Sequence, residues 1–188
     1  MRLKTILNYG LKFKCFCIGK SEFNEKKDSI IVEIKARTNS KPVCSICGTA
    51  SPGYDTLPER LFEFVPMWGL RVFFHYAMRR VSCPQCKRVV VEAVPWCDGK
   101  NHFTNHYAAF LASWAKELSW KSVAAHFHTS WQTVCSAVES VVNYGLTHRN
   151  LDSVTALGVD EIAWHKGHKY LTLVYQINPG ARRLLWVG

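Results

Sequence analysis

The chain has 188 residues, 48% of them hydrophobic, and a formal net charge of +10 at pH 7. This length and hydrophobic content indicate one or two folded domains rather than a disordered chain. Basic residues interrupt the first 20 positions, and no stretch reaches the apolar length of a membrane span, so neither a signal peptide nor a transmembrane helix is expected. The basic residues are Arg2, Lys4, Lys12, Lys14 and Lys20. The eight cysteines therefore favour thiols or metal ligands in the cytosol over a secreted disulfide scaffold.

The positive charge lies mainly in the first half of the chain. Residues 1–100 carry 17 Lys and Arg against 9 Asp and Glu, whereas residues 101–188 carry 7 against 5. A basic segment of this kind favours a polyanionic partner, most simply nucleic acid. The alternative is ordinary solubilising charge.

Residues 1–40 predict an amino-terminal β hairpin. Residues 12–18 alternate between apolar and polar side chains, residues 24–28 form a polar turn, and residues 29–35 make the returning strand. Cys15 and Cys17 share one face of the first strand, and we expect them to pack in the core rather than bind a metal.

Residues 41–100 predict a zinc ribbon. Two C-x-x-C pairs, Cys44 with Cys47 and Cys83 with Cys86, supply four thiolates, the ligand set that a structural Zn²⁺ ion favours. Gly48 allows the tight turn after the first pair. Strands are expected at residues 60–65, 70–81 and 88–94. The alternatives are four unrelated buried cysteines or two disulfides.

Four basic residues bracket the second cysteine pair: Arg79, Arg80, Lys87 and Arg88. A metal held there would fix a basic edge, and we expect that edge to contact DNA phosphates. The alternative is a solvated edge that only deters strand pairing. Residues 96–104 form a polar linker. A metal site formed by Cys97, His102 and the nearby His106 is the less favoured possibility, because the four-cysteine set already closes a coordination shell.

Residues 101–148 predict a DNA-binding helix-turn-helix. The hydrophobic period becomes helical, with helices expected at residues 106–118, 120–127 and 131–144 and a short break before the third. Residues near the start of that helix would reach base edges: Ser130, Gln132, Thr133 and Ser136. Gln132 is the best base reader of these, since its amide can bond adenine bidentately. Lys121 in the second helix is a further DNA-contact candidate. A plain three-helix bundle for packing or dimerisation is the alternative.

The last 40 residues change to strands. Residues 154–164, 169–177 and 182–187 predict an antiparallel set, with Asp160 on the first strand. From its local sequence alone, Asp160 is better explained as a strand-end carboxylate that makes local hydrogen bonds than as a catalytic residue.

The order of these features resembles the ISL-three family of insertion-sequence transposases over residues 40–188. The residues that carry the resemblance, besides the cysteine pairs and helices, are Leu157-Gly158-Val159-Asp160-Glu161 and Gly167-His168-Lys169-Tyr170-Leu171-Thr172. The resemblance implies that Asp160 is the first aspartate of a DDE triad in an RNase H-like domain, which holds two Mg²⁺ ions for phosphoryl transfer. It also implies a bacterial cytoplasmic, nucleoid-associated protein. The implied partners are double-stranded DNA at the inverted repeats of the element and, as an option, a second copy of the chain.

The chain departs from that family after Gly188, because the second aspartate and the glutamate of the triad would lie farther downstream. Glu161 would face the other side of its strand and is a poor substitute. We therefore expect an α+β chain in which residues 149–188 are an incomplete catalytic domain, inactive alone, with Mg²⁺ bound only by a full-length domain. The alternatives are a non-enzymatic, zinc-dependent DNA-binding protein that represses transposition, or a degenerate product without function.

Overall fold

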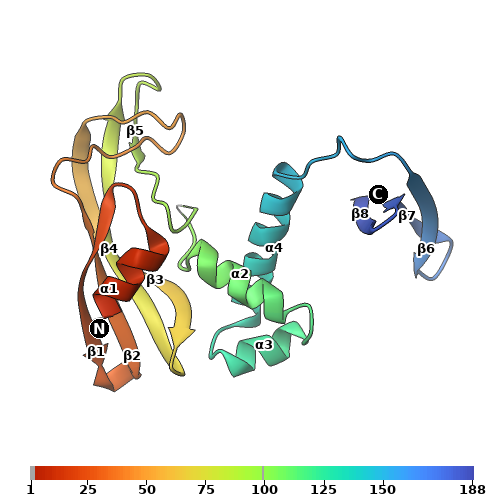
Figure 1. Cartoon of the computed structure of the whole chain (residues 1–188), viewed down its shortest axis with the longest axis horizontal. Helices are drawn as coiled ribbons and strands as arrows, with labels where there is room; N and C mark the ends of the chain where they lie inside the picture. Colours follow the sequence, from red (N-terminus) through yellow and green to blue (C-terminus); the bar gives the residue numbers. More distant parts are fainter. Residues whose placement is uncertain (1–2, 99) are drawn as a thin grey trace. The chain divides into compact units, whose positions relative to one another are not determined.

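The computed structural model describes residues 3–98 and 100–188 (Figure 1). They form two compact units, and the chain passes from the first to the second between Asn143 and Tyr144. Arg2, which entered the signal-peptide prediction, and Gly99, in the predicted linker, lie outside the described residues. Both helices and strands are present, so the α+β class is confirmed.

The first unit begins with a short helix and a five-stranded sheet. Their bounds are α1 Leu3–Leu11, β1 Phe16–Asn24, β2 Ser29–Ala36, β3 Gly53–Met67, β4 Leu70–Cys83 and β5 Arg88–Val91, with a 3-10 turn, η1, at Glu25–Lys27. The strand order is β1-β2-β4-β3, and β5 also pairs with β4. β1 and β2 form the expected antiparallel hairpin. β2 then runs parallel to β4, so the predicted hairpin and the predicted ribbon share one sheet.

β3 lies at the edge of this sheet, which explains how its two prolines are tolerated. Pro58 and Pro66 each lie where the pairing of β3 with β4 shifts register, between Thr56 and Glu59 and between Phe64 and Met67. A proline has no N–H to donate to a sheet, so edge positions and bulges are where strands accept it.

The core of the first sheet forms around Trp96, which is fully buried. The rings of Phe16 and Tyr76 meet the indole edge-on, with centroids 4.9 and 5.2 Å away. Along β4, buried residues such as Phe74 and Met78 alternate with half-exposed ones, as the period of a strand requires.

The first predicted strand was placed too early. Residues 3–11 are helical, and β1 begins at Phe16 rather than at residue 12. Phe16 and Ile18 are buried, so Cys17 between them lies on the other face, half-buried, at a surface pocket. The prediction that Cys15 and Cys17 pack together in the core therefore holds only for Cys15, which contacts the core cluster.

Three helices follow the sheet: α2 Asn105–Trp114, α3 Trp120–His126 and α4 Trp131–Thr147, and the boundary between the units falls within α4. Thr104 and Ser119 cap α2 and α3 through their side-chain oxygens, and Ser130 accepts from the Thr133 amide at 3.1 Å at the start of α4. Their shared core contains Tyr107, Leu111, Val123, Val134 and Ala137. α2 ends four residues before the end predicted for the first helix, at residue 118. α4 continues three residues beyond the end predicted for the third helix, at residue 144.

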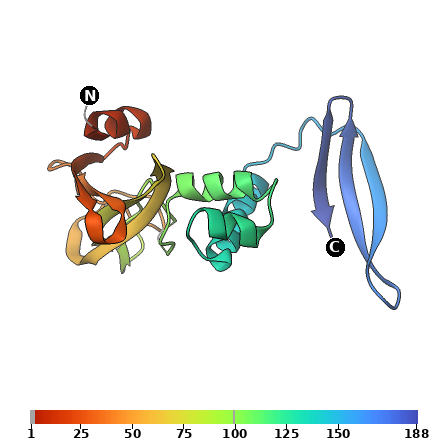
Figure 2. The same cartoon turned by 90° about the horizontal axis from the view of Figure 1, so that it is seen from below.

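The second unit holds a three-stranded antiparallel sheet in the order β6-β7-β8 (Figure 2). The bounds are β6 Leu157–His165, β7 Lys169–Asn178 and β8 Ala181–Val187, which agree with the predicted strands to within three residues. Large apolar side chains stay exposed on it, among them Val159, Trp164 and Trp186. Within the described ranges, no helix is long and apolar enough to cross a membrane.

Candidate metal centre and nucleic-acid interface

The two cysteine pairs lie on two backbone turns of similar construction. In the first, the Gly48 amide donates to the Cys44 carbonyl at 3.0 Å, and Gly48 has φ of +73°. In the second, the Cys86 amide donates to the Cys83 sulfur at 3.4 Å, and Lys87 has φ of +52°. Gly48 and Lys87 each follow the first cysteine of their pair by four residues, so both turns need a left-handed residue at the same place. Only the first has a glycine for it.

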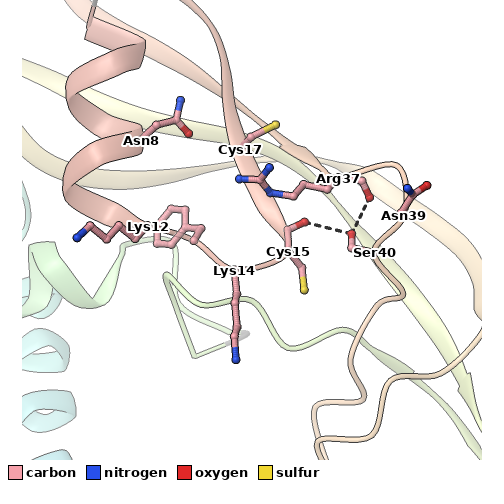
Figure 3. Close-up of a pocket in the computed structure, with 9 residues that line it drawn as sticks. Asn8, Lys12, Lys14, Cys15, Cys17, Arg37, Asn39 and Ser40 are labelled. Atoms are coloured by element: carbon pink, nitrogen blue, oxygen red, sulfur yellow. Dashed lines mark hydrogen bonds between the residues drawn. The ribbon is translucent and has the colours of Figure 1, made fainter.

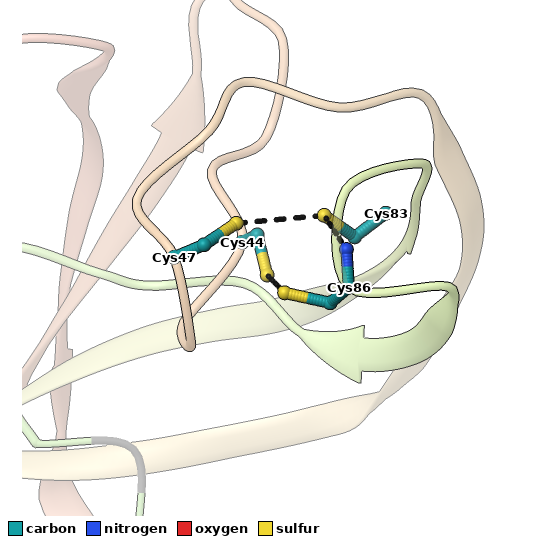
Figure 4. A group of neighbouring side chains, drawn as sticks. All are labelled: Cys44, Cys47, Cys83 and Cys86. Atoms are coloured by element: carbon teal, nitrogen blue, oxygen red, sulfur yellow. Dashed lines mark hydrogen bonds between the residues drawn. The ribbon is translucent and has the colours of Figure 1, made fainter.

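The four sulfurs converge (Figure 4). All four lie within 4.8 Å of one another, with Cys47 Sγ 3.5 Å from Cys83 Sγ and Cys44 Sγ 3.9 Å from Cys86 Sγ. Zn–S bonds of about 2.3 Å in a tetrahedron place the sulfurs about 3.8 Å apart. Disulfide bonding requires an S–S distance of about 2.05 Å, so the spacing fits a metal and not a pair of disulfides. The four cysteines therefore form a cluster that could bind a metal ion such as zinc.

The protonation of these thiols follows from their contacts. The hydrogen bond from the Cys86 amide lowers the pKa of Cys83 to about 6, which favours its thiolate at neutral pH. The neighbouring Cys47 thiol and then burial raise the pKa of Cys86 to about 12. A thiol that coordinates a metal is deprotonated, so metal binding at this cluster would release protons.

A buried ion pair fastens the metal cluster to the sheet. Glu92 forms a backbone bridge with Cys44, and its carboxylate is fully buried. This carboxylate accepts hydrogen bonds from Tyr76 Oη at 2.7 Å, from the Arg79 amide at 2.8 Å and from Arg79 Nη2 at 2.7 Å. Arg79 also donates to the Ser40 carbonyl at 3.3 Å. This network joins the sheet core to the residues that lead into the first cysteine pair.

The four basic residues near the second cysteine pair differ in their surroundings. Arg79 is paired with buried Glu92, and Arg80 is paired with the exposed carboxylate of Asp55 and lowers its pKa. Lys87 and Arg88 are exposed beside the metal cluster. Of the four, Lys87 and Arg88 are therefore accessible to solvent, whereas Arg79 stabilises the fold through Glu92.

The residues predicted to read bases lie at the start of α4. Gln132 and Ser136 are exposed, and the Ser130 and Thr133 hydroxyls are 2.9 Å apart. Lys121 is exposed on α3. The turn between α3 and α4 contains His128 with φ of +51°, which lets the chain reverse within a few residues.

A loop that the sequence analysis treated as a linker lies beside the start of α4. Lys100, Asn101 and His102 line a crevice of about 290 Å³ together with Glu63, Gln132, Thr133 and Ser136. Two backbone hydrogen bonds of 2.8 Å fix this loop to β3. The Glu63 amide donates to the His102 carbonyl, and the Thr104 amide donates to the Glu63 carbonyl. The loop therefore adds two basic side chains to the predicted reading surface. No local sequence pattern indicated this, because it depends on the pairing with Glu63.

The remaining site predictions have simpler outcomes. Asp160 is exposed on β6, where it pairs with Leu173, and its carboxylate accepts the Glu161 amide at 2.8 Å. The four cysteines are the one group of three or more potential metal ligands found in residues 3–98 and 100–188, so Cys97, His102 and His106 do not converge.

Sequence comparison finds relatives among transposases. The chain is 27% identical over 146 residues to the transposase for insertion sequence element IS1001 of Bordetella parapertussis, which covers 78% of this chain and 36% of that protein. It is 29% identical over 166 residues to the transposase for insertion sequence element IS1557 of Mycobacterium tuberculosis, covering 85% of this chain and 36% of that protein. No family model and no solved structure matches. The chain is thus similar to insertion-sequence transposases over most of its own length, and it spans little more than a third of theirs.

Proposed function

We propose that this chain is the DNA-binding amino-terminal portion of a DDE transposase of the ISL-three family, and that it recognises the ends of its element. The observation that carries the proposal is the similarity to insertion-sequence transposases over 78% and 85% of the chain. The net charge of +10 and the cysteine cluster support the same function, because a basic, metal-stabilised module suits a polyanionic partner.

In this proposal the cysteine cluster holds one structural zinc ion in a zinc ribbon, and α2, α3 and α4 form a helix-turn-helix. The start of α4 enters the major groove, where Gln132 bonds a base edge. Lys87, Arg88, Arg80 and Lys121 contact phosphates and set the position of the module on the duplex. Arg79 supports this surface through Glu92, and a phosphate contact of its own stays a prediction.

For the second unit we propose that β6, β7 and β8 are the first strands of an RNase H-like domain, with Asp160 as the first carboxylate of the triad. Two Mg²⁺ ions held by such a triad would activate the attacking oxygen and stabilise the leaving oxygen. Asp160 supplies one carboxylate, and a single carboxylate does not hold two ions, so we expect no strand transfer from these 188 residues alone.

A gel-shift competition tests the proposal. Zinc-loaded protein at about 0.15 M salt should prefer the terminal inverted repeats of its own element over a scrambled duplex of equal length by about 10³-fold or more. Gln132→Ala should relax that preference at one base pair, whereas Lys116→Ala, an exposed lysine of the α2–α3 connection, should leave it intact. Equal binding of both duplexes by the wild-type protein would contradict end recognition.

A second candidate is a non-enzymatic DNA-binding protein that represses transposition by occupying the same ends. The observation in its favour is that, in the part of the chain that the structure describes, the cysteines alone form a potential metal cluster and Asp160 stands apart from one. Cleavage or strand transfer by this chain with Mg²⁺ would exclude it. A homodimer fits either function, since element ends come in pairs. Sedimentation of the protein with a paired-end DNA substrate in the analytical ultracentrifuge would detect such a dimer.

A further inference from the structure

A basic pocket of about 810 Å³ lies between α1, the loop that leads into β1, and the turn after β2 (Figure 3). Lys12 and Lys14 come from the loop and Arg37 from the turn, so three residues with cationic side chains line one pocket although 23 positions separate Lys14 from Arg37 in the chain. None of the nine lining residues found in the described chain is acidic.

The backbone around this pocket is held in place. The Arg37 amide donates to the Cys15 carbonyl at 2.9 Å, and the Ser40 hydroxyl donates to the same carbonyl at 3.1 Å. On the other wall, the Ile18 amide donates to the Asn8 side chain at 3.1 Å, which ties α1 to β1. The pocket is therefore a fixed feature of the hairpin rather than a gap between loose loops.

The charge of the pocket is not neutralised by the protein. Three arginines of the sheet have a carboxylate partner: Arg71 with Glu63, Arg79 with Glu92, and Arg80 with Asp55. Across residues 3–98 and 100–188, no ion pair is found for Lys12, Lys14 or Arg37. In Figure 3 the Arg37 guanidinium points into the space between α1 and β1, while Lys12 and Lys14 extend from the rim.

The other walls are weakly polar and lower the local dielectric constant. Phe13, Cys15 and Cys17 line the pocket beside the cations, and both cysteines are half-buried. A cation next to such walls attracts an anion more strongly than one that is surrounded by water. A planar guanidinium matches the oxygen atoms of a phosphate, and the flexible lysine side chains at the rim can turn toward a bound anion.

We propose that this pocket binds backbone phosphates of DNA, as a second contact surface separate from the start of α4 and from Lys87 and Arg88. The inference rests on the proposed DNA-binding function and extends it to the amino-terminal hairpin. It implies that the hairpin helps to position the duplex without reading its sequence.

The test compares two charge-matched double variants. Lys14→Ala/Arg37→Ala removes two pocket cations, while Lys26→Ala/Lys27→Ala removes two exposed cations from η1, at the other end of the hairpin and roughly 25 Å away along β1. If Lys14 and Arg37 each contact a phosphate, the slope of log K against log salt should fall by about 1.8, with about tenfold weaker binding on every duplex at 0.15 M salt. The control variant should change the slope by much less.

The pocket cysteines give a second readout that does not depend on the variants. Iodoacetamide should alkylate Cys15 and Cys17 of the zinc-loaded protein in the absence of DNA, and a saturating duplex should protect them, as peptide mass spectrometry would show. Protection by millimolar inorganic phosphate but not by DNA would overturn the assignment to a nucleic-acid backbone.

The remaining outcomes separate this inference from the proposed function. If the wild-type protein binds no DNA, the proposed function fails and this inference fails with it. If the wild-type protein binds DNA while both double variants lose the same affinity and the cysteines stay reactive, the pocket assignment alone is wrong.

Discussion

Replacement of Glu92 by alanine should destabilise the first unit far more than the loss of an exposed glutamate would. The Glu92 carboxylate is fully buried and accepts hydrogen bonds from Tyr76 and from the backbone and side chain of Arg79, whose side chain is itself only 20% exposed. Its removal leaves the guanidinium and the phenol partly buried without their acceptor. Breaking a buried ion pair in this way costs about 3–5 kcal/mol of unfolding free energy.

The neighbouring pair of Arg80 with Asp55 supplies the control. Both of its side chains are about 40% exposed, at 39% and 41%, so Asp55→Ala should change stability little. Urea unfolding of the zinc-loaded proteins, followed by tryptophan fluorescence, would measure both effects, since Trp96 lies in the same core as Tyr76. A loss for Glu92→Ala no larger than that for Asp55→Ala would refute the view that this network joins the metal cluster to the sheet.

Other predictions concern pH, the turn at the second cysteine pair and the second unit. Burial raises the pKa of Tyr76 and Tyr107, with Glu92 and Glu63 adding to the effect, so the native state favours their neutral forms. Their contribution to stability should be complete below pH about 10 and be lost as the pH rises above it; absorbance at 295 nm should show them ionising only as the protein unfolds. Lys87→Gly should raise the unfolding free energy by up to about 1 kcal/mol, because φ at this position is +52°, and yet weaken DNA binding in a gel shift by removing a cation. Asp160→Ala should leave the dissociation constant for the element ends unchanged, and a clear loss would place this residue at the DNA interface instead.

Local patterns were enough to predict most elements of the fold. The spacing of the two C-x-x-C pairs predicts that their four sulfurs lie close together, because four thiolates at this spacing are typical of a shared metal site. The structure confirms that the sulfurs converge. The hairpin of β1 and β2 and the three strands of the second unit follow from period-two alternation and turn residues. Capping by Thr104 and Ser119 likewise marks helix starts that can be found from residue type.

Features that depend on contacts between distant segments could not be predicted in this way. The parallel pairing of β2 with β4 joins two segments that local alternation treats as separate, and no turn signal announces it. Arg79 and Arg80 are adjacent and chemically identical, and only the fold gives the first a buried partner and the second an exposed one. The pocket at Arg37 also needs α1, which the sequence analysis missed.

Metal content is the most direct test of the four-cysteine site on which the proposed DNA-binding module depends. Protein purified without added metal should contain one zinc ion per chain by mass spectrometry, with Cys44, Cys47, Cys83 and Cys86 protected from alkylation until a chelator removes the ion. Protein that contains no zinc, with all four thiols freely alkylated and the fold intact, would contradict the site.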